Sequence, residues 1–244
     1  MQTIIFSTAG SSPALTYAKN QLTAWGYRVS NQIDEAATHI LLPVPSVDES
    51  GIIRGGASWK QLLDRVSDHA TILGGNLPAT AKKTVDFLQD AYYTAENAAI
   101  TAHCAITLAM QTMNRSLKNT KILIIGWGRI GKCLCESLRP FGAALAVATR
   151  KKSDRAILEA LGYDAPEIEG IVPENYGLII NTVPALVLDA NAVSGKITLI
   201  DLASTRGIIG DRVIWARGLP NQMAPEASGA LIAKTALRYA LGKE

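Results

Sequence analysis

Residues 121–131 read Lys-Ile-Leu-Ile-Ile-Gly126-Trp-Gly128-Arg129-Ile130-Gly131, and a helical pattern follows through residue 141. A short β-branched run ahead of Gly-x-Gly-x-x-Gly predicts a strand, a tight turn and a helix. Gly126 permits the turn, Gly128 lets backbone amides approach a pyrophosphate, and Gly131 lets the helix pack closely on the strand. The helix N-terminus favours the anion. This context predicts a dinucleotide-binding Rossmann unit, with a glycine-rich packing turn as the alternative.

Outside this stretch, apolar runs alternate with helical patterns, which predicts an α/β fold of two doubly wound parallel-sheet domains. The expected order is a flavodoxin-like substrate domain at 1–93, an interdomain helix within 94–118 with Thr94 as its N-cap, the Rossmann domain at 119–222, and a helix at 223–244 that packs back on the first domain. The first domain is expected to hold strands at 3–7, 27–29, 39–42 and 71–73, and helices at 14–25, 58–66 and 79–88. The Rossmann domain is expected to hold strands at 122–125, 144–148, 178–181, 198–202 and 213–216.

Composition excludes several classes of protein. Hydrophobic residues make up 48% of the 244 residues and charged residues 18%, which indicates a globular chain. The formal charge is only +3, from 24 basic and 21 acidic residues, so neither nucleic acid nor a membrane is the expected partner. No apolar run reaches the roughly 18 residues of a membrane span and the first residues lack a leader pattern, so we expect a cytoplasmic protein. The chain has three cysteines, Cys104, Cys133 and Cys135, and no histidine lies close enough in sequence to complete a metal-ligand spacing with the Cys133-Leu-Cys135 pair, so we expect reduced, buried thiols and no metal.

The residues after the second Rossmann strand indicate the cofactor. NAD-binding versions of the fold have an acidic residue there, about 20 positions after the glycines, which binds the ribose hydroxyl. Here Thr149 stands eighteen positions after Gly131, followed by Arg150, Lys151, Lys152 and Ser153. Basic and hydroxyl side chains suit a 2′-phosphate, which a carboxylate would repel. We therefore predict NADP as the cofactor, with a solvated basic turn as the alternative.

Two further loops follow predicted strands, and ligands of open parallel sheets lie beyond the carboxyl ends of the strands. The loops Asn181-Thr182-Val183-Pro184 and Asp201-Leu202-Ala203-Ser204 are therefore expected to border the nicotinamide, although ordinary turn chemistry would also explain their composition. Arg129 is expected to reach a cofactor phosphate or a substrate carboxylate.

The histidines argue against a dehydrogenase of D-2-hydroxy acids, a class with the same two-domain layout. Such an enzyme uses a histidine acid/base late in its cofactor domain. All three histidines, His39, His69 and His103, precede the glycine loop. We expect His39 and His69 to have structural roles. The role of His103, in the interdomain helix, is left open.

Six segments resemble the A-type subunits of bacterial dipicolinate synthase. They are Ile-Leu-Leu-Pro-Val (40–44), Thr-Ala-Glu (94–96), Gly-Trp-Gly-Arg-Ile-Gly (126–131), Asn-Thr-Val-Pro-Ala (181–185), Ile-Asp-Leu-Ala-Ser (200–204) and Gly-Leu-Pro-Asn-Gln-Met-Ala-Pro (218–225). The resemblance covers nearly the whole chain and is strongest from Thr94 onward. The chain departs from the family pattern at Asn97, at 205–208 and at Asn221, and its first ninety residues look shortened.

The resemblance implies a sporulation enzyme of dipicolinic acid biosynthesis that oxidises a dihydrodipicolinate-type precursor to pyridine-2,6-dicarboxylate with NADP⁺, in the mother cell of a spore-forming bacterium. It also implies a flavoprotein-like partner, the B-type subunit of dipicolinate synthase. The alternatives are another NADP-dependent oxidoreductase of a small carboxylate, and a non-catalytic NADP-binding or regulatory protein. Assembly into a homo-oligomer is left open.

The implied oxidation needs a proton acceptor and groups that hold two carboxylates. Glu96, which opens the interdomain helix, is the first candidate acceptor and Asp201 the second; a glutamate stabilised by the helix dipole is the alternative for Glu96. The candidate substrate-binding residues are Ser11, Ser12, Pro43, Thr94 and Arg206. Arg54 and Arg129 are further candidate cations.

Overall fold

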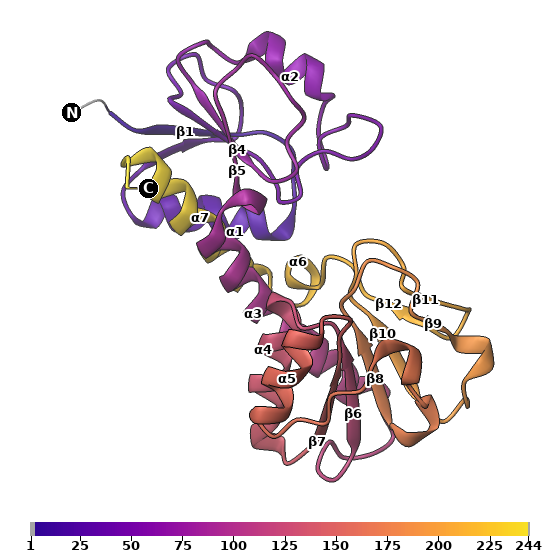
Figure 1. Ribbon diagram of the computed structural model, residues 1–244. Coiled ribbons are helices and arrows are strands. Elements are labelled where there is room, and N and C mark those ends of the chain that lie inside the picture. Colours follow the sequence, from indigo (N-terminus) through magenta and orange to yellow (C-terminus); the bar gives the residue numbers. More distant parts are fainter. Residues whose placement is uncertain (1–2, 244) are drawn as a thin grey trace. The chain divides into compact units, whose positions relative to one another are not determined.

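The computed structural model describes residues 3–243, and over this range the chain has two parallel five-stranded sheets covered by helices (Figure 1). The predicted α/β fold with two parallel sheets is thus confirmed. The chain divides into two compact units: unit 1 comprises the residues up to Asn97 together with those from Pro220 onward, and unit 2 comprises Ala98–Leu219. The long helix α3 (Ala91–Thr112) contributes residues to both units.

The sheet of unit 1 has the strand order β2-β1-β3-β4-β5, which is the flavodoxin-like order. Its strands are β1 (Ile5–Thr8), β2 (Arg28–Ser30), β3 (His39–Leu41), β4 (Thr71–Gly74) and β5 (Thr84–Asp86). Every residue of β4 is buried, because helices lie on both faces of the sheet. Figure 1 shows α2 (Trp59–Arg65) on the face opposite to α1 (Pro13–Ala24) and α7 (Pro225–Ala240).

The helices α1 and α7 pack closely on each other in unit 1. A Cβ atom added at Gly229 in α7 would lie 2.4 Å from the Cβ of Tyr17 and 2.6 Å from the carbonyl oxygen of Ala14, both in α1. The absence of a side chain at Gly229 therefore permits the contact. Because α7 is separated from α1 by most of the chain, this contact ties the last helix to unit 1.

One helix predicted near the end of unit 1 is wrong. The helix expected over 79–88 is instead the edge strand β5 and a short 3₁₀ helix, η1 (Phe87–Gln89). The carboxylate of Asp86 accepts hydrogen bonds from the backbone N–H groups of Asn76, Leu77 and Leu88 at 3.1, 3.2 and 2.8 Å, which holds this segment against β4. Pairing between strands distant in sequence outweighed the local helical pattern.

Helix α3 begins earlier than predicted. The carboxylate of Asp90 accepts a hydrogen bond from the backbone N–H of Tyr93 at 2.7 Å, which is the geometry of an N-cap. Thr94 is not the cap: its hydroxyl donates back to the carbonyl oxygen of Asp90 at 2.8 Å from within the first turn.

Unit 2 has the sheet order β12-β10-β8-β6-β7, with all strands parallel. Its strands are β6 (Lys121–Ile125), β7 (Ala144–Ala148), β8 (Leu178–Asn181), β10 (Thr198–Asp201) and β12 (Ile214–Trp215), close to the five predicted ranges. A single parallel bridge between Ala146 and Asp164 adds one residue pair beyond β7. If this bridge is counted as the third strand of unit 2, the strand order is the 3-2-1-4-5-6 order of Rossmann domains. This third strand, which the sequence patterns did not predict, is thus only one residue long.

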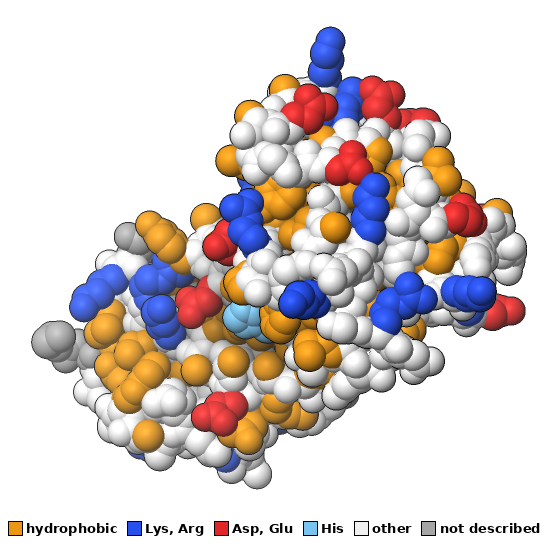
Figure 2. Space-filling model, turned by 90° about the horizontal axis from the view of Figure 1, so that it is seen from below, with side chains coloured by type: hydrophobic (Ala, Val, Ile, Leu, Met, Phe, Trp, Pro, Cys, Tyr) orange, Lys and Arg blue, Asp and Glu red, His pale blue; other side chains and the backbone are white. Residues whose placement is uncertain are grey.

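Shorter elements complete the structure. They are α4 (Arg129–Leu138), η2 (Arg139–Phe141), α5 (Lys152–Ala160), η3 (Ile168–Gly170), η4 (Pro173–Asn175), η5 (Ala190–Ala192), α6 (Leu219–Met223), and the paired strands β9 (Leu188–Asp189) and β11 (Ile208–Ile209). Within residues 3–243, no helix is long and apolar enough to cross a membrane. Basic and acidic side chains are interspersed on the face drawn in Figure 2, in keeping with the near balance of charge in the sequence.

Candidate dinucleotide-binding site

The glycine loop between β6 and α4 is packed tightly at two of its glycines. Gly126 has φ +107°, and a Cβ there would lie 2.4 Å from the hydroxyl oxygen of Thr182. The backbone N–H and the hydroxyl of Thr182 both donate to the carbonyl oxygen of Ile125 at 2.9 Å, which fixes the loop after β8 beside the turn. A Cβ at Gly131 would lie 2.1 Å from the carbonyl oxygen of Gly126. These glycines are therefore required by the packing of the protein itself.

Gly128 is different, because its surroundings are open. A Cβ at this residue would meet nothing within 4 Å, and its φ of −81° is allowed to any residue. Gly128 is the N-cap of α4, and no side chain among the described residues caps the helix there. The first amides of α4, from Arg129, Ile130 and Gly131, thus face space that an anion could fill. This open helix start fits the pyrophosphate of a dinucleotide, and the close packing at Gly131 fits the same fingerprint.

The turn after β7 carries exposed positive charge on a fixed backbone. Thr149 is buried, whereas Arg150, Lys151 and Ser153 are exposed. The guanidinium of Arg155 donates to the carbonyl oxygens of Thr149 and Arg150 at 3.2 and 3.1 Å, and it also forms an ion pair with Glu167. Arg155 lies in α5, and no motif in the sequence predicts its role. Its hydrogen bonds hold the backbone of the turn at Thr149 and Arg150 in one conformation.

The same turn opens α5 with three basic residues, and Asp154 is the acidic residue of the first turn of the helix. Arg150, Lys151 and Lys152 are adjacent at the helix start, where the helix dipole favours anions over cations. Lys151 is the N-cap and makes no capping hydrogen bond through its side chain within the described structure. A bound anion would offset this local repulsion.

The loops after β8 and β10 are joined by a buried pair, Asn181 and Asp201, and both side chains are fully buried. The side-chain nitrogen of Asn181 donates to the carboxylate of Asp201 and to the carbonyl oxygen of Val183, both at 2.9 Å. The side-chain oxygen of Asn181 accepts from the backbone N–H of Val183 at 3.0 Å. Asn181 thereby sets the conformation of the loop that continues through Thr182 and Pro184.

Asp201 organises the other loop. Besides Asn181, its carboxylate accepts hydrogen bonds from the backbone N–H groups of Ala203, Gly207 and Ile208 at 3.0, 2.7 and 2.9 Å. A carboxylate has about four acceptor sites, and four donors occupy them. The geometry therefore makes Asp201 a positioning residue, which holds Leu202, Ala203 and Ser204 at the carboxyl edge of the sheet. A role as proton acceptor, predicted from the sequence, would require these contacts to break.

Gly207 brings the two loops together. A Cβ at this residue would lie 2.4 Å from the side-chain nitrogen of Asn181 and 2.7 Å from the carbonyl oxygen of Val183. Its own carbonyl oxygen accepts a hydrogen bond from the backbone N–H of Val187 at 2.7 Å. The structure thus gathers the glycine loop, the segment 181–184 and the segment 202–204 at one edge of the unit 2 sheet, as strand order and chain direction require.

Two arginines stack on one indole close to this edge. The guanidinium carbons of Arg206 and Arg217 lie 4.7 and 5.3 Å from the ring centroid of Trp215. The indole N–H of Trp215 donates to the carbonyl oxygen of Ala203 at 3.1 Å, which holds the ring against the loop after β10. Of these three residues, Arg206 alone was predicted to bind substrate. Trp215 and Arg217, at and beyond the last strand, were missed because no spacing pattern marks them.

The predicted substrate residues of unit 1 divide into two places. The backbone N–H and hydroxyl of Ser11 donate to the carbonyl oxygens of Arg54 and Gly55, and the hydroxyl oxygen of Ser12 caps α1 by accepting from Leu15 at 3.1 Å. The ring of Pro43 would lie 3.2 Å from a Cβ at Gly10, so Pro43 belongs to the same carboxyl edge of the sheet. Thr94 lies instead in the first turn of α3. Arg206 belongs to unit 2.

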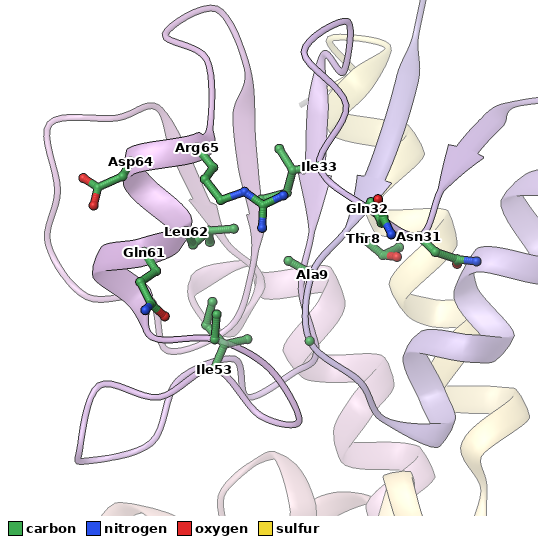
Figure 3. Close-up of a pocket in the computed structure, with 12 residues that line it drawn as sticks. Thr8, Ala9, Asn31, Gln32, Ile33, Ile53, Gln61, Leu62, Asp64 and Arg65 are labelled. Atoms are coloured by element: carbon green, nitrogen blue, oxygen red, sulfur yellow. The ribbon is translucent and has the colours of Figure 1, made fainter.

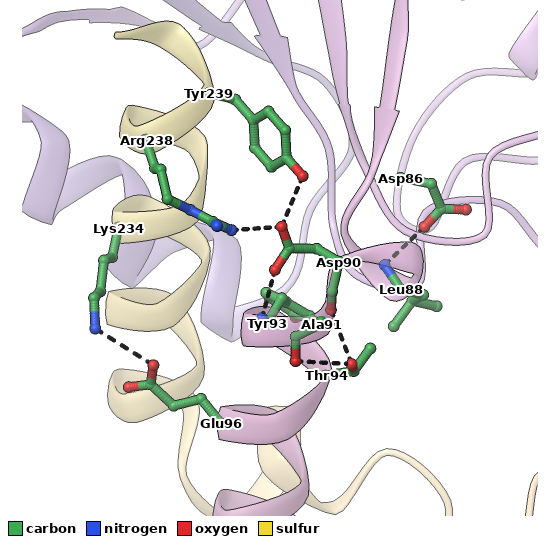
Figure 4. Close-up of polar contacts among 10 residues, drawn as sticks. All are labelled: Asp86, Leu88, Asp90, Ala91, Tyr93, Thr94, Glu96, Lys234, Arg238 and Tyr239. Atoms are coloured by element: carbon green, nitrogen blue, oxygen red, sulfur yellow. Dashed lines mark hydrogen bonds and ion pairs between the residues drawn. The ribbon is translucent and has the colours of Figure 1, made fainter. Parts of the chain in front are cut away.

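Glu96 lies on α3 and faces α7 of the same unit (Figure 4). Its carboxylate forms an ion pair with Lys234 at 3.4 Å, and half of the Glu96 side-chain surface is exposed. Nearer the start of α3, Asp90 is buried and binds Arg238 at 2.5 Å and the Tyr239 hydroxyl at 2.7 Å. Burial would raise the pKa of Asp90, but hydrogen bonds from Tyr239, the Tyr93 backbone and Arg238 outweigh it and lower the pKa. Asp90 is thus a structural carboxylate, and Glu96 is the accessible one.

His39 and His69 stand at or before the start of a strand, and His103 stands within α3. His39 begins β3, and burial, with a smaller effect of Lys83, lowers its pKa to about 4, so it is neutral at pH 7. His69 is exposed beside Ser67, and His103 is exposed on α3. Cys104 and Cys135 are buried, burial raises the pKa of the Cys135 thiol to about 12, and no group of side chains within residues 3–243 could hold a metal ion.

The strand order, the glycine loop and the open start of α4 define a dinucleotide-binding fold of the dehydrogenase type. No protein-family model matches the chain. It is 26% identical over 222 residues to the A-type subunit of dipicolinate synthase from Bacillus subtilis strain 168, covering 80% of this chain and 74% of that protein. The resemblance predicted from the six segments is therefore confirmed.

Solved structures show the same fold. The crystal structure of the A-type subunit of dipicolinate synthase from Bacillus halodurans superposes with a TM-score of 0.82 at 21% identity, covering 98% of each chain. The transhydrogenase of Sinorhizobium meliloti superposes with a TM-score of 0.70 at 15% identity, covering 97% of this chain and 93% of that one. The fold thus extends over both units of the chain.

Proposed function

We propose that this chain is the A-type subunit of a dipicolinate synthase and oxidises a dihydrodipicolinate-type precursor to pyridine-2,6-dicarboxylate with NADP⁺. One observation carries the cofactor assignment: α4 begins at Gly128 and α5 begins after Lys151, both at the same edge of one sheet, and neither helix start has a side-chain cap in the described structure. The sequence relationship to the Bacillus subtilis protein supports the choice of reaction.

The proposed cofactor contacts follow from the order of the loops along the edge. The amides of Arg129, Ile130 and Gly131 bind the pyrophosphate. Thr149, Arg150, Lys151 and Ser153 bind the 2′-phosphate of the adenosine ribose. The loops 181–184 and 202–204 border the nicotinamide. When bound there, NADP⁺ supplies the hydride acceptor.

The substrate side needs positioning more than electrophilic assistance. Loss of a hydride and a proton from a dihydropyridine yields an aromatic ring, so the reaction can proceed without a histidine that polarises a carbonyl group. Arg206, held on Trp215 beside the 202–204 loop, is the proposed partner of one substrate carboxylate. Ser11, Ser12, Pro43 and Thr94 are the proposed substrate contacts of unit 1.

Glu96 is the proposed proton acceptor. It is a half-exposed carboxylate in the first turns of α3, and a general base must be accessible to the proton that it removes. Glu96→Gln keeps the shape of the side chain and removes its basicity, so kcat should fall about 100-fold or more while the affinity for NADPH stays unchanged. The matched control is Lys234→Gln, which removes the ion pair but not the carboxylate. Unchanged turnover of Glu96→Gln would remove this residue from the mechanism.

The experiment that tests the reaction supplies the purified chain with NADP⁺ and fresh precursor, made by condensing pyruvate with aspartate semialdehyde. NADPH and dipicolinate absorbance are followed together, with and without a flavoprotein-like B-type subunit. Coupled formation of both products is the expected result. NADPH binding without turnover, unless the B-type subunit is present, would favour a non-catalytic NADP-binding protein, and binding without any turnover would favour a different small carboxylate as substrate. The molecular mass of the same preparation in solution shows whether the chain is a homo-oligomer.

The proposed setting follows from the same relationship. An A-type subunit of dipicolinate synthase would act with its B-type partner in the cytoplasm of the mother cell of a spore-forming bacterium. Fluorescence microscopy of the tagged chain during sporulation tests this location, and signal confined to the forespore would contradict it.

A further inference from the structure

A cavity of about 720 Å³ lies within unit 1, at the carboxyl ends of β1 and β2 (Figure 3). Its walls come from the segment after β1, the segment after β2, the loop before α2, and α2 itself. The lining residues are Thr8, Ala9, Gly10, Asn31, Gln32, Ile33, Ile53, Ala57, Gln61, Leu62, Asp64 and Arg65. Its volume falls in the range of small-molecule sites, and the carboxyl edge of a parallel sheet is where such sites form. It contains none of the residues assigned above to NADP or to the substrate.

Arg65 is the cation of this cavity. Its guanidinium extends from the end of α2 toward Ile33, across the opening, whereas the carboxylate of Asp64 points away from it (Figure 3). Within residues 3–243, Arg65 makes no hydrogen bond or ion pair, although Arg28 and Lys82 of the same unit are both paired with aspartates. An arginine presents five N–H donors in a fork that matches a carboxylate.

Two side-chain amides of the wall are held in place by hydrogen bonds to their oxygens. The oxygen of Gln61 accepts from the backbone N–H of Ser58, and the oxygen of Asn31 accepts from the ammonium of Lys19 at 2.8 Å. A backbone N–H and an ammonium can only donate, so the orientation of both amides is fixed by their partners. Asn31 is thereby turned toward α1, on the face of the sheet opposite to α2, and away from Arg65 (Figure 3). Gln61 is held in the capping box at the start of α2.

The remaining surface is apolar. Ile33, Ile53 and Leu62 line the cavity between the polar groups, and Ile53 and Leu62 belong to the buried core on the α2 face of the sheet. This combination suits a ligand with a hydrocarbon or aromatic body and at least one negatively charged acceptor group. A bare phosphate would leave the apolar walls uncovered.

We propose that this cavity is a binding site for a small organic carboxylate, in which Arg65 is the anchoring cation and Ile33, Ile53 and Leu62 cover the apolar body of the ligand. The site goes beyond the proposed function and does not rest on it, because the ligand is held by unit 1 residues that take no part in the proposed hydride transfer.

The test measures binding to the full chain by calorimetry, without NADP⁺ and without turnover. Pyridine-2,6-dicarboxylate is the probe, and pyridine-2,6-dimethanol is the uncharged control with the same ring. Arg65→Gln should weaken binding of the dicarboxylate about tenfold or more, because a charge-assisted, forked hydrogen bond is lost. Lys60→Gln is the matched control: it removes the same charge from an exposed residue of the same helix that does not line the cavity, and its Kd should stay within about twofold of the wild type.

A second measurement places the ligand. Backbone amide signals of Thr8, Ala9 and Gly10 should shift with the dicarboxylate in NMR spectra of the wild type and of Lys60→Gln, and should not shift in Arg65→Gln. Arg65→Lys, which keeps the charge but not the fork, should bind with intermediate affinity. A carboxylate bound elsewhere in the chain persists in Arg65→Gln, so the affinities compared are those of the binding event that shifts the signals of Thr8, Ala9 and Gly10. Equal affinities of Arg65→Gln and wild type, equal losses in Arg65→Gln and Lys60→Gln, or no binding at millimolar dicarboxylate would overturn the proposal.

Discussion

Replacing Gly128 with alanine should weaken cofactor binding and leave the stability of the fold nearly unchanged. A Cβ at Gly128 meets no atom within 4 Å, and the backbone there is allowed to alanine. Stability should therefore change by less than about 1 kcal/mol, because the gain from a less flexible unfolded chain offsets the poorer N-cap. The new methyl group would nevertheless occupy the space from which the amides of α4 reach a pyrophosphate. Losing one charge-assisted hydrogen bond costs about 1.5–3 kcal/mol, which raises the Kd for NADPH about 10- to 150-fold.

Gly131→Ala is the contrasting variant. Its Cβ would collide with the carbonyl oxygen of Gly126 at 2.1 Å, so the start of α4 must move. Overpacking of this kind costs about 1–3 kcal/mol, and each kcal/mol lowers the Tm by about 2–4 °C. Thermal unfolding and NADPH titration of both variants check the reasoning. It would be refuted if Gly128→Ala bound NADPH within twofold of the wild type, or if Gly131→Ala unfolded at the wild-type temperature.

Three further predictions follow from the two units. Arg150→Gln combined with Lys151→Gln should weaken NADPH binding about tenfold or more and leave NADH binding unchanged, as fluorescence titration will show; equal losses for both would contradict a 2′-phosphate site. Asp90→Asn should destabilise the chain by about 2 kcal/mol at pH 7 in urea. The pKa of Asp90 is lower in the folded chain than its unfolded value near 3.9. The stability that ionised Asp90 contributes is therefore present above about pH 3.9 and is lost as the pH falls through the folded pKa. The difference in unfolding free energy between wild type and Asp90→Asn should accordingly shrink toward pH 3 and not grow. Asp201→Asn should cost about 1–3 kcal/mol in urea, since the amide would face donors from Gly207 and Ile208; an unchanged midpoint would contradict its positioning role.

The parts of the fold that sequence reasoning predicted are those encoded within a few residues. The strand and glycine loop at 121–131 were predicted because an apolar run and three glycines act through local sterics and backbone conformation. The failures have the opposite cause. Residues 84–86 form a strand because they pair with β4, which is distant in the local pattern. The third Rossmann strand consists of Asp164 alone, which is too short to show a periodic pattern in the sequence.

The site followed the same division. The loops after β8 and β10 were expected at the carboxyl edge of the sheet, because strand direction places all such loops there. The roles of their side chains could not be predicted. In the sequence Asp201 is a carboxylate like any other, and in the structure four donors occupy it.

The sequence by itself therefore determined the α/β class, the glycine turn of the dinucleotide-binding unit and the basic residues that follow β7, because turn chemistry and hydrophobic periodicity act over neighbouring residues. Only the tertiary structure decided which polar groups meet. Asp90 binds Arg238 across 148 positions of the chain, and Arg65, beside a cavity, has no polar partner among residues 3–243. Such pairings depend on the packing of segments that are distant in sequence, and that packing is fixed by burial of the whole core.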